Sequence, residues 1–120
     1  MVHRDTFPCV DNVHIETAED MRTAVHDCFA SKGADIYISA AAISDFAPQK
    51  IDGKLPSGKR TKIELEPLPK LLDEVAKKYS SRIIAFKLGR NQEKIAGDMI
   101  AKGDIDMVLV NAPELSLIHI

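Results

Sequence analysis

Apolar residues recur along this chain at two spacings, and each spacing predicts one kind of element. Intervals of three and four residues place apolar side chains on one helix face, whereas short continuous apolar runs are typical of buried strands. The first spacing predicts helices over residues 18–32, 68–79 and 91–102. The second predicts strands at residues 13–15, 35–40 and 82–86 and at 106–110, and alternation predicts a half-exposed strand at 62–66.

Polar residues and glycines at the ends of these segments support the helix predictions. Thr17 is an expected N-cap with Asp20 three positions later, and Gly33 is an expected left-handed C-terminal cap. Asn91 is expected to cap the third helix, and Gly103 is expected to end it.

Strands that alternate with helices imply right-handed crossovers and a parallel sheet. We therefore expect an α/β fold, a Rossmann-like doubly wound parallel sheet, truncated at both ends. The chain starts directly at a strand, without a Gly-rich phosphate turn before it. Its last six residues, Leu115–Ile120, match a translated sequencing adapter, although they also read as an ordinary apolar segment. The expected division is a partial α/β domain at 1–114 and a non-native tail at 115–120.

Composition narrows the function classes. The 120 residues carry a net charge of −2, which gives no reason to expect nucleic acid. No apolar run is long enough to predict a membrane span, and no signal peptide is recognisable, so a cytoplasmic protein is expected. Cys9 and Cys28 lack a metal or redox spacing, and Cys28 is expected to be a small core residue. The histidines have no partner at ligand spacing, so no metal site is predicted.

Ligands of open α/β sheets bind beyond the carboxyl ends of the strands, and the segment at 41–60 follows such an end. Ala40 and Ala41 would let backbone approach a ligand closely, and Asp45 supplies a carboxylate. In the alternative interpretation, the alanines pack under a helix and Asp45 caps a turn. Five cations follow between Pro48 and Lys62, which suits phosphoryl chemistry but is also typical of a solvated surface.

Other candidates have simpler alternatives. Lys102 is expected at a helix C-terminus, where the helix dipole alone would favour its positive charge. Phe86 is expected to be a core residue by default, although its edge could face a base. Asp73 and Glu74 lie on an amphipathic helix and are expected to be solvated.

The segment Ala40-Ala-Ala-Ile-Ser-Asp-Phe-Ala-Pro-Gln-Lys-Ile51 resembles the strand, acid and lysine segment of phosphopantothenoylcysteine synthetases. Four later stretches agree in order, so the resemblance covers roughly residues 10–114: Lys54–Gly58, Glu66–Leu72, Ile84–Lys87 and Asp106–Asn111. It implies nucleotide-binding residues at Ser39, Ala40, Ala41, Asp45, Lys50, Leu68, Pro69, Lys70, Leu71, Phe86 and Lys102. Lys50 would also be catalytic, reaching the phosphates from a flap.

The resemblance also implies a reaction. A ligase of this family activates 4′-phosphopantothenate with a nucleoside triphosphate, CTP or ATP with Mg²⁺, and condenses it with cysteine. Such enzymes are homodimers and are often fused behind a decarboxylase, which would bring FMN. They take small-molecule substrates, with no nucleic acid and no membrane.

The chain departs from the family pattern at several positions. Leu68 stands where the family usually has an asparagine, and Asp52 stands where it often has a second lysine. After Phe86, many members have small residues followed by a Glu-Thr pair, whereas this chain has Lys87-Leu-Gly-Arg90. We expect the 120 residues alone to be inactive. A non-catalytic nucleotide-binding module and a fragment of a dinucleotide oxidoreductase remain alternatives.

Overall fold

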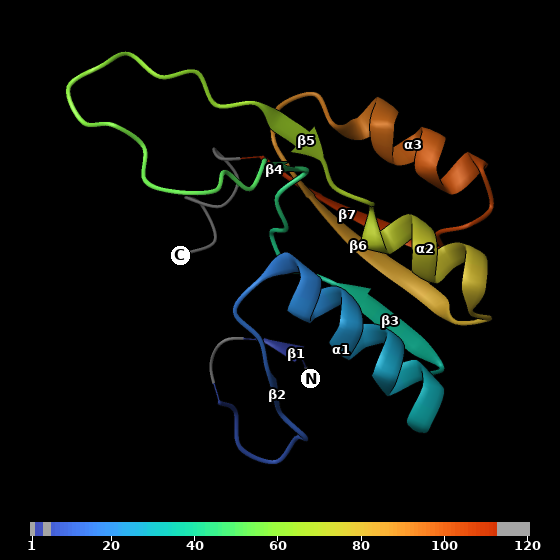
Figure 1. Cartoon of the computed structure of the whole chain (residues 1–120). Helices are drawn as coiled ribbons and strands as arrows, with labels where there is room; N and C mark the ends of the chain where they lie inside the picture. Colours follow the sequence, from blue (N-terminus) through green and yellow to red (C-terminus); the bar gives the residue numbers. More distant parts are fainter. Residues whose placement is uncertain (1, 4–5, 113–120) are drawn as a thin grey trace.

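Three parallel strands organise the chain, in the order β3 (Ile36–Ser39), β6 (Arg82–Leu88) and β7 (Met107–Asn111) (Figure 1). This computed structural model describes residues 2–3 and 6–112. Ser39 pairs with Ala85 of the central strand, and Ala85 pairs in turn with Val108. The carboxyl end of β3 therefore lies beside Ala85, and β6 continues past it to Leu88.

Two small pairs of strands flank this sheet. β1 (Val2–His3) runs parallel to β2 (Val13–His14), and β4 (Phe46–Pro48) runs antiparallel to β5 (Leu65–Pro67). The residues between β4 and β5, 49–64, form an arm that stretches away from the rest of the chain (Figure 1). The sequence predicted a single strand in this region, at 62–66, so β4 was missed and β5 begins later than expected.

The three helices are α1 (Ala18–Ser31), α2 (Leu71–Lys78) and α3 (Glu93–Ala101). The predicted capping box of α1 is confirmed, because the Thr17 hydroxyl accepts from the Asp20 N–H at 3.0 Å and the Asp20 carboxylate accepts from the Thr17 N–H at 2.9 Å. Gly33 follows α1 with φ +70°, as expected for a left-handed cap.

The predicted start of α3 is wrong. Gln92 is the N-cap and makes no side-chain capping hydrogen bond, while Asn91 has φ +55° in the turn before it. Asn91 therefore precedes the N-cap, in the turn that joins β6 to α3. Gly103, with φ +78°, ends the helix as predicted.

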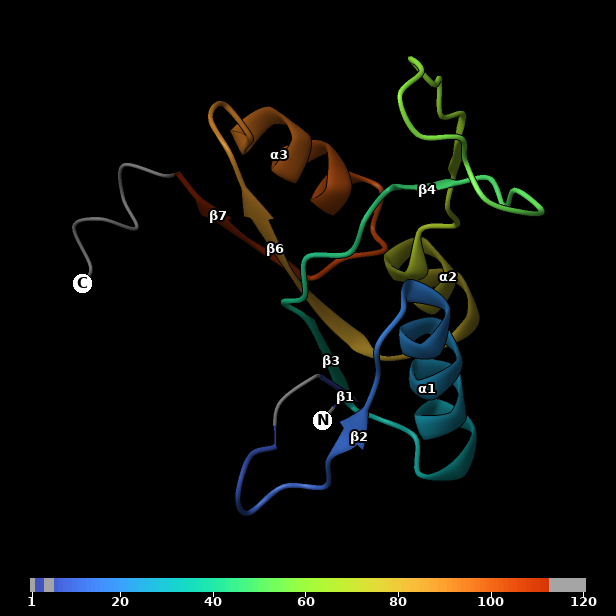
Figure 2. The same cartoon turned by 60° about the vertical axis from the view of Figure 1, so that its left-hand side comes forward.

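The core lies between the helices and one face of the sheet. Met21 and Val25 of α1 meet Leu71 and Val75 of α2 over the strand residues, and Ile83 is 1% exposed. Ala85 of β6 and Ile105, just before β7, complete the buried cluster. Partly buried apolar residues pack against it: Ile15, Phe29, Tyr37, Leu72, Ala76, Tyr79, Met99 and Val108. Figure 2 shows α1 and α2 side by side on one side of the strands.

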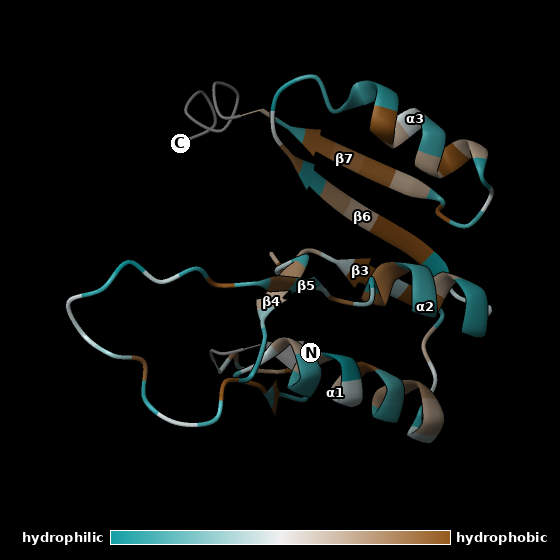
Figure 3. Cartoon of the chain, turned by 45° about the horizontal axis from the view of Figure 1, so that its top comes forward, coloured by the Kyte–Doolittle hydropathy of each residue, from teal (hydrophilic) through white to brown (hydrophobic). Residues whose placement is uncertain are grey.

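The opposite face of the sheet is apolar and open among the described residues. Side chains alternate along each strand, so the neighbours of the core residues point the other way. Figure 3 shows the strands as the most hydrophobic part of the chain. The large apolar residues exposed on this face are Ile36, Ile38, Phe86, Leu88, Met107 and Leu109. The expectation that Phe86 is a core residue is therefore wrong, since it is 46% exposed.

The α/β class and the Rossmann-like parallel sheet are confirmed. Cys28 is only half-buried, on a helix whose buried residues are Met21 and Val25. Within residues 2–3 and 6–112, no helix combines the length and the apolar character that a membrane crossing needs. The tail interpretation at Leu115–Ile120 falls outside the described residues.

Candidate functional site

A hollow of about 410 Å³ opens at the carboxyl ends of β3 and β6, between the start of α2 and one face of α3. Eight of the residues singled out by the family resemblance line it: Ser39, Ala41, Asp45, Pro69, Lys70, Leu71, Phe86 and Lys102. The remaining lining residues are Ile43, Ser44, Leu72, Asp73, Ala85, Lys87, Ile95, Asp98 and Met99. The hollow therefore lies where the topology of an open parallel sheet places a ligand.

Asp45 is held beside the start of α2 by its backbone. Its carbonyl oxygen accepts a hydrogen bond from the Leu68 N–H at 2.8 Å, immediately before β4. Its carboxylate makes no hydrogen bond within the described part of the chain, so the alternative that Asp45 caps a turn has no support there. Ala40 and Ala41 are exposed, which contradicts the alternative that they pack under a helix.

The start of α2 forms one wall of the hollow. Lys70 is the N-cap, and its side chain makes no capping hydrogen bond. The first N–H groups of a helix have no partner within the helix, so they and the helix dipole favour an anion at this end. Pro69, Lys70 and Leu71 line the hollow here, whereas Leu68 does not.

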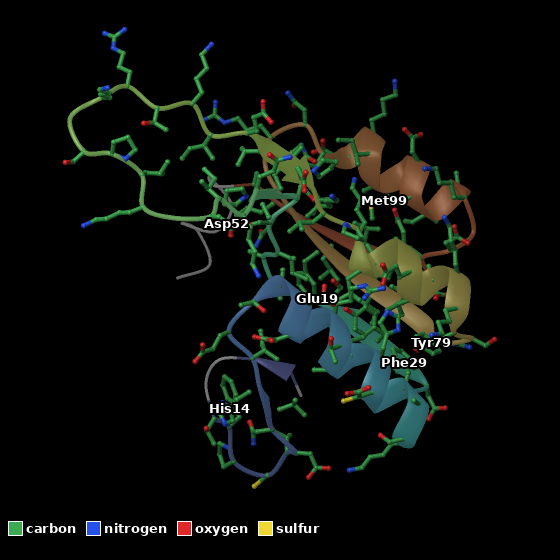
Figure 4. The ribbon with its side chains drawn as sticks, viewed as in Figure 1. His14, Glu19, Phe29, Asp52, Tyr79 and Met99 are labelled. Carbon is green, nitrogen blue, oxygen red and sulfur yellow. The ribbon has the colours of Figure 1, made fainter. Side chains whose placement is uncertain are left out.

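One stripe of α3 forms the opposite wall. Ile95, Asp98, Met99 and Lys102 line the hollow, and their spacing of three and four residues places them on one helix face. Met99, labelled in Figure 4, belongs to this stripe. Lys102 is the C-cap of α3, so its favourable position at the helix dipole and its place in the hollow are compatible.

Charged side chains of both signs line the hollow. The lysines are Lys70, Lys87 and Lys102, and the carboxylates are Asp45, Asp73 and Asp98. None of the six forms an ion pair with another described residue. Lysines from the start of α2, β6 and the end of α3 thus surround a space large enough for part of a nucleotide. No carboxylate of the described residues forms an ion pair with them.

Lys50 lies apart from this group. It follows β4 on the exposed arm and is absent from the lining of the hollow, as are Ala40 and Leu68. Asp52, two residues further along the arm, is labelled in Figure 4. The expectation that Asp45 and Lys50 share one hollow is not met within this chain.

Sequence reasoning assigned no role in the site to three charged residues, Asp73, Lys87 and Asp98. Asp73 was expected to be solvated, and it is exposed while also lining the hollow. Lys87 was noted only as a departure from the family pattern. Its position in an apolar strand, two residues after the buried Ala85, is the signal that marks it.

Within the described residues, no group of three or more His, Cys, Asp or Glu is arranged to hold a metal ion. Asp45, Asp73 and Asp98 supply hard oxygen donors around the hollow without forming such a group. This donor set fits a Mg²⁺ ion that arrives bound to phosphate oxygens and takes few protein ligands.

Comparison with known proteins identifies the family. The profile described as the DNA/pantothenate metabolism flavoprotein C-terminal domain matches residues 1–116. The coenzyme A biosynthesis bifunctional protein CoaBC of Thermococcus kodakarensis is 32% identical over 108 residues, which are 84% of this chain and 27% of that protein. The protein of the same name from Methanocaldococcus jannaschii is also 32% identical over 108 residues, 85% of this chain and 26% of its own length.

The chain therefore spans about a quarter of the length of these relatives. The family match, in contrast, covers nearly the whole chain, including every residue that lines the hollow. This chain belongs to the family of DNA/pantothenate metabolism flavoprotein C-terminal domains.

Proposed function

We propose that this chain is the nucleotide-binding part of an enzyme of coenzyme A biosynthesis that ligates 4′-phosphopantothenate to cysteine. The observation that carries the proposal is the hollow at the ends of β3 and β6, which gathers Ser39, Ala41 and Asp45 with the start of α2. The names of the two relatives support the pathway, since both are coenzyme A biosynthesis proteins.

The proposed reaction has two steps. The carboxylate of 4′-phosphopantothenate attacks the α-phosphorus of CTP, or of ATP, and pyrophosphate leaves with the electrons of the broken P–O bond. The amine of cysteine then attacks the acyl carbon, loses a proton, and releases the nucleoside monophosphate. A Mg²⁺ ion bound to the triphosphate would offset phosphate charge, and Asp45, Asp73 and Asp98 are the residues of the hollow that would help to hold it.

The residues of the hollow have distinct roles in this proposal. The N–H groups at the start of α2 and the ammonium groups of Lys70 and Lys102 hold phosphate oxygens. Asp45 accepts hydrogen bonds from the nucleoside or helps to hold the Mg²⁺ ion. The small residue Ala41 leaves room for the nucleotide beyond the end of β3.

Lys50 requires a different arrangement. Since the arm at 49–64 stretches away from the hollow, we propose that Lys50 acts on a nucleotide only after the arm moves or within a homodimer. Any flavin belongs, in this proposal, to a region of the longer protein outside the segment matched here.

Asp45→Asn tests the binding role. The variant is expected to weaken CTP or ATP binding about tenfold in calorimetry, because a charged hydrogen-bond acceptor is lost. Asp104→Asn is the matched control, as Asp104 is exposed and lies outside the lining of the hollow. Equal affinities for the two variants would remove Asp45 from the site.

Lys50→Ala tests the catalytic role in the complete gene product. Pyrophosphate release is expected to slow by about a hundredfold, because a cation that stabilises charge on the phosphates is removed. Lys77→Ala on the exposed end of α2 is the control. A release rate equal to that of the control would show that Lys50 takes no part in the first step. If the unmodified complete gene product binds the nucleotide but releases no pyrophosphate, the result would favour a non-catalytic module.

A further inference from the structure

We propose that Lys87, at the carboxyl end of β6, binds the phosphates of the nucleotide in this chain. The inference rests on the proposed nucleotide-binding function and adds a residue to it. Lys87 is the penultimate residue of the central strand, and it lines the hollow together with Asp45, Lys70 and Lys102.

The register of the sheet places Lys87 on the helix-bearing face. Ile83 and Ala85 of β6 are 1% and 2% exposed under the helices, and Lys87 occupies the next position of the same alternation. Its neighbour in β7 is Val110. The side chain therefore continues an otherwise apolar row, and the hollow begins where that row ends.

A lysine at such a position lowers the stability of the fold unless an opposite charge lies near its ammonium group. The side chain is half-buried, and partial burial removes water from the ammonium group. No described residue forms an ion pair with it, although three carboxylates line the same hollow. An anionic ligand in the hollow would supply the missing charge.

The geometry around Lys87 favours phosphate as that anion. The start of α2 offers free N–H groups on one side of the hollow, and Lys102 approaches from the end of α3 on the other. A polyphosphate spans several donors at once, which a single carboxylate does not. Asp98, one turn before Lys102 on the same face of α3, makes a cation on the strand more important, because its charge opposes phosphate.

The test measures the affinity of the chain for CTP, ATP and CMP by calorimetry in the presence of Mg²⁺. Lys87→Met keeps the length of the side chain and removes its charge. We expect it to weaken triphosphate binding about tenfold or more and CMP binding much less, because a charge-assisted contact to phosphate is lost. Lys94→Met, an exposed lysine of α3 outside the hollow, is the matched control and is expected to bind as the unmodified chain does.

Lys87→Arg separates charge from packing. The arginine keeps the positive charge, so affinity for the triphosphate is expected to stay within about threefold of the original. If a folded Lys87→Arg variant, checked by circular dichroism, loses binding as Lys87→Met does, the role of Lys87 is packing and the proposal is wrong.

The remaining outcomes distinguish the two proposals. Binding of CTP or ATP that is equally strong in Lys87→Met and Lys94→Met would refute the role of Lys87 and leave the nucleotide site standing. Failure of the unmodified chain to bind either triphosphate would overturn the proposed function and the role of Lys87 together.

Discussion

Glu74 joins α1 to α2 through two side chains of α1. The single N–H at Nε of Arg22 is shared between the two carboxylate oxygens of Glu74, 3.0 and 2.9 Å away, and Nε2 of His26 lies 2.9 Å from the carboxylate. Because a carboxylate only accepts, Nε2 of His26 donates to it, and Nδ1 of the same ring lies 2.7 Å from the Tyr79 hydroxyl oxygen. The Tyr79 ring in turn stacks on Phe29 with a centroid distance of 4.1 Å (Figure 4).

This network makes the helix pair sensitive to acid. The hydrogen bond from His26, followed by the contact with Arg22, lowers the pKa of Glu74 below its ordinary value. A group with a lowered pKa in the folded state stabilises the fold above its unfolded pKa. That stabilisation is lost as the pH falls through the folded value.

We predict that Glu74→Gln lowers the free energy of unfolding by about 1 kcal/mol near neutral pH, a modest value because a quarter of the side chain is exposed. The variant is also expected to lose stability less steeply than the original chain between about pH 6 and pH 3. Urea denaturation at a series of pH values measures both effects, with Glu64→Gln on the arm as the control. Parallel pH profiles for all three proteins would contradict the role of Glu74.

At this scale, the sequence predicts contacts between near neighbours and misses distant ones. Thr17 and Asp20 are three residues apart, so their capping box is visible as a short motif. Arg22 and His26 lie 52 and 48 residues from Glu74, and nothing near Glu74 marks it as their partner. The expectation that Glu74 is solvated was therefore wrong.

Long helices and strands were predicted from the sequence, whereas very short strands were missed. α1, α2, β3 and β6 were predicted because each shows several apolar residues at a regular spacing. β1 and β4 have two and three residues, which is too short for any periodicity to be visible. Asn91 has the residue type of a cap, but the turn that ends β6 gives it a left-handed backbone.

Burial of Ile83 in the core is expected to contribute to the stability of the fold, whereas an exposed isoleucine on the arm should contribute little. We predict that Ile83→Val, at a position that is 1% exposed, lowers the free energy of unfolding by about 0.5–1.5 kcal/mol because one methylene group leaves the core. Ile63→Val on the arm, where Ile63 is 57% exposed, is the matched control and should change stability by less than about 0.5 kcal/mol. Denaturant unfolding of both variants measures the difference, and equal effects would contradict the position of the core.

For the whole molecule, the location of the site was more predictable than its members. Ligands of open parallel sheets bind beyond the strand ends, which placed the site at the segment 41–60, whereas the family resemblance named Ser39, Asp45 and Phe86 as its members. Lys50 was placed with them through the family resemblance, but the path of the arm, which no local pattern determines, carries it away. Lys87 joins the site through the register of β6, which is visible only once the sheet is assembled.

The extended arm and the open sheet face leave the chain with a large surface. Its accessible surface is 9827 Å², whereas a compact protein of 13.2 kDa is expected to expose about 6,400 Å². The hollow, in contrast, is built from β3, β6, α2 and α3, which pack around the core. Nucleotide binding should therefore depend on this packed part of the chain and not on the arm's position alone.

The most direct test of the site is a nuclear magnetic resonance titration of the isotope-labelled chain with CTP and with ATP, each with Mg²⁺. The hollow predicts that backbone amide signals shift first at Ser39, Asp45, Leu71 and Lys87, and that signals on the outer surface of α1 stay in place. Shifts that gather around Arg22 and His26 instead, or no shift at a millimolar concentration of either nucleotide, would contradict a nucleotide site at the ends of β3 and β6.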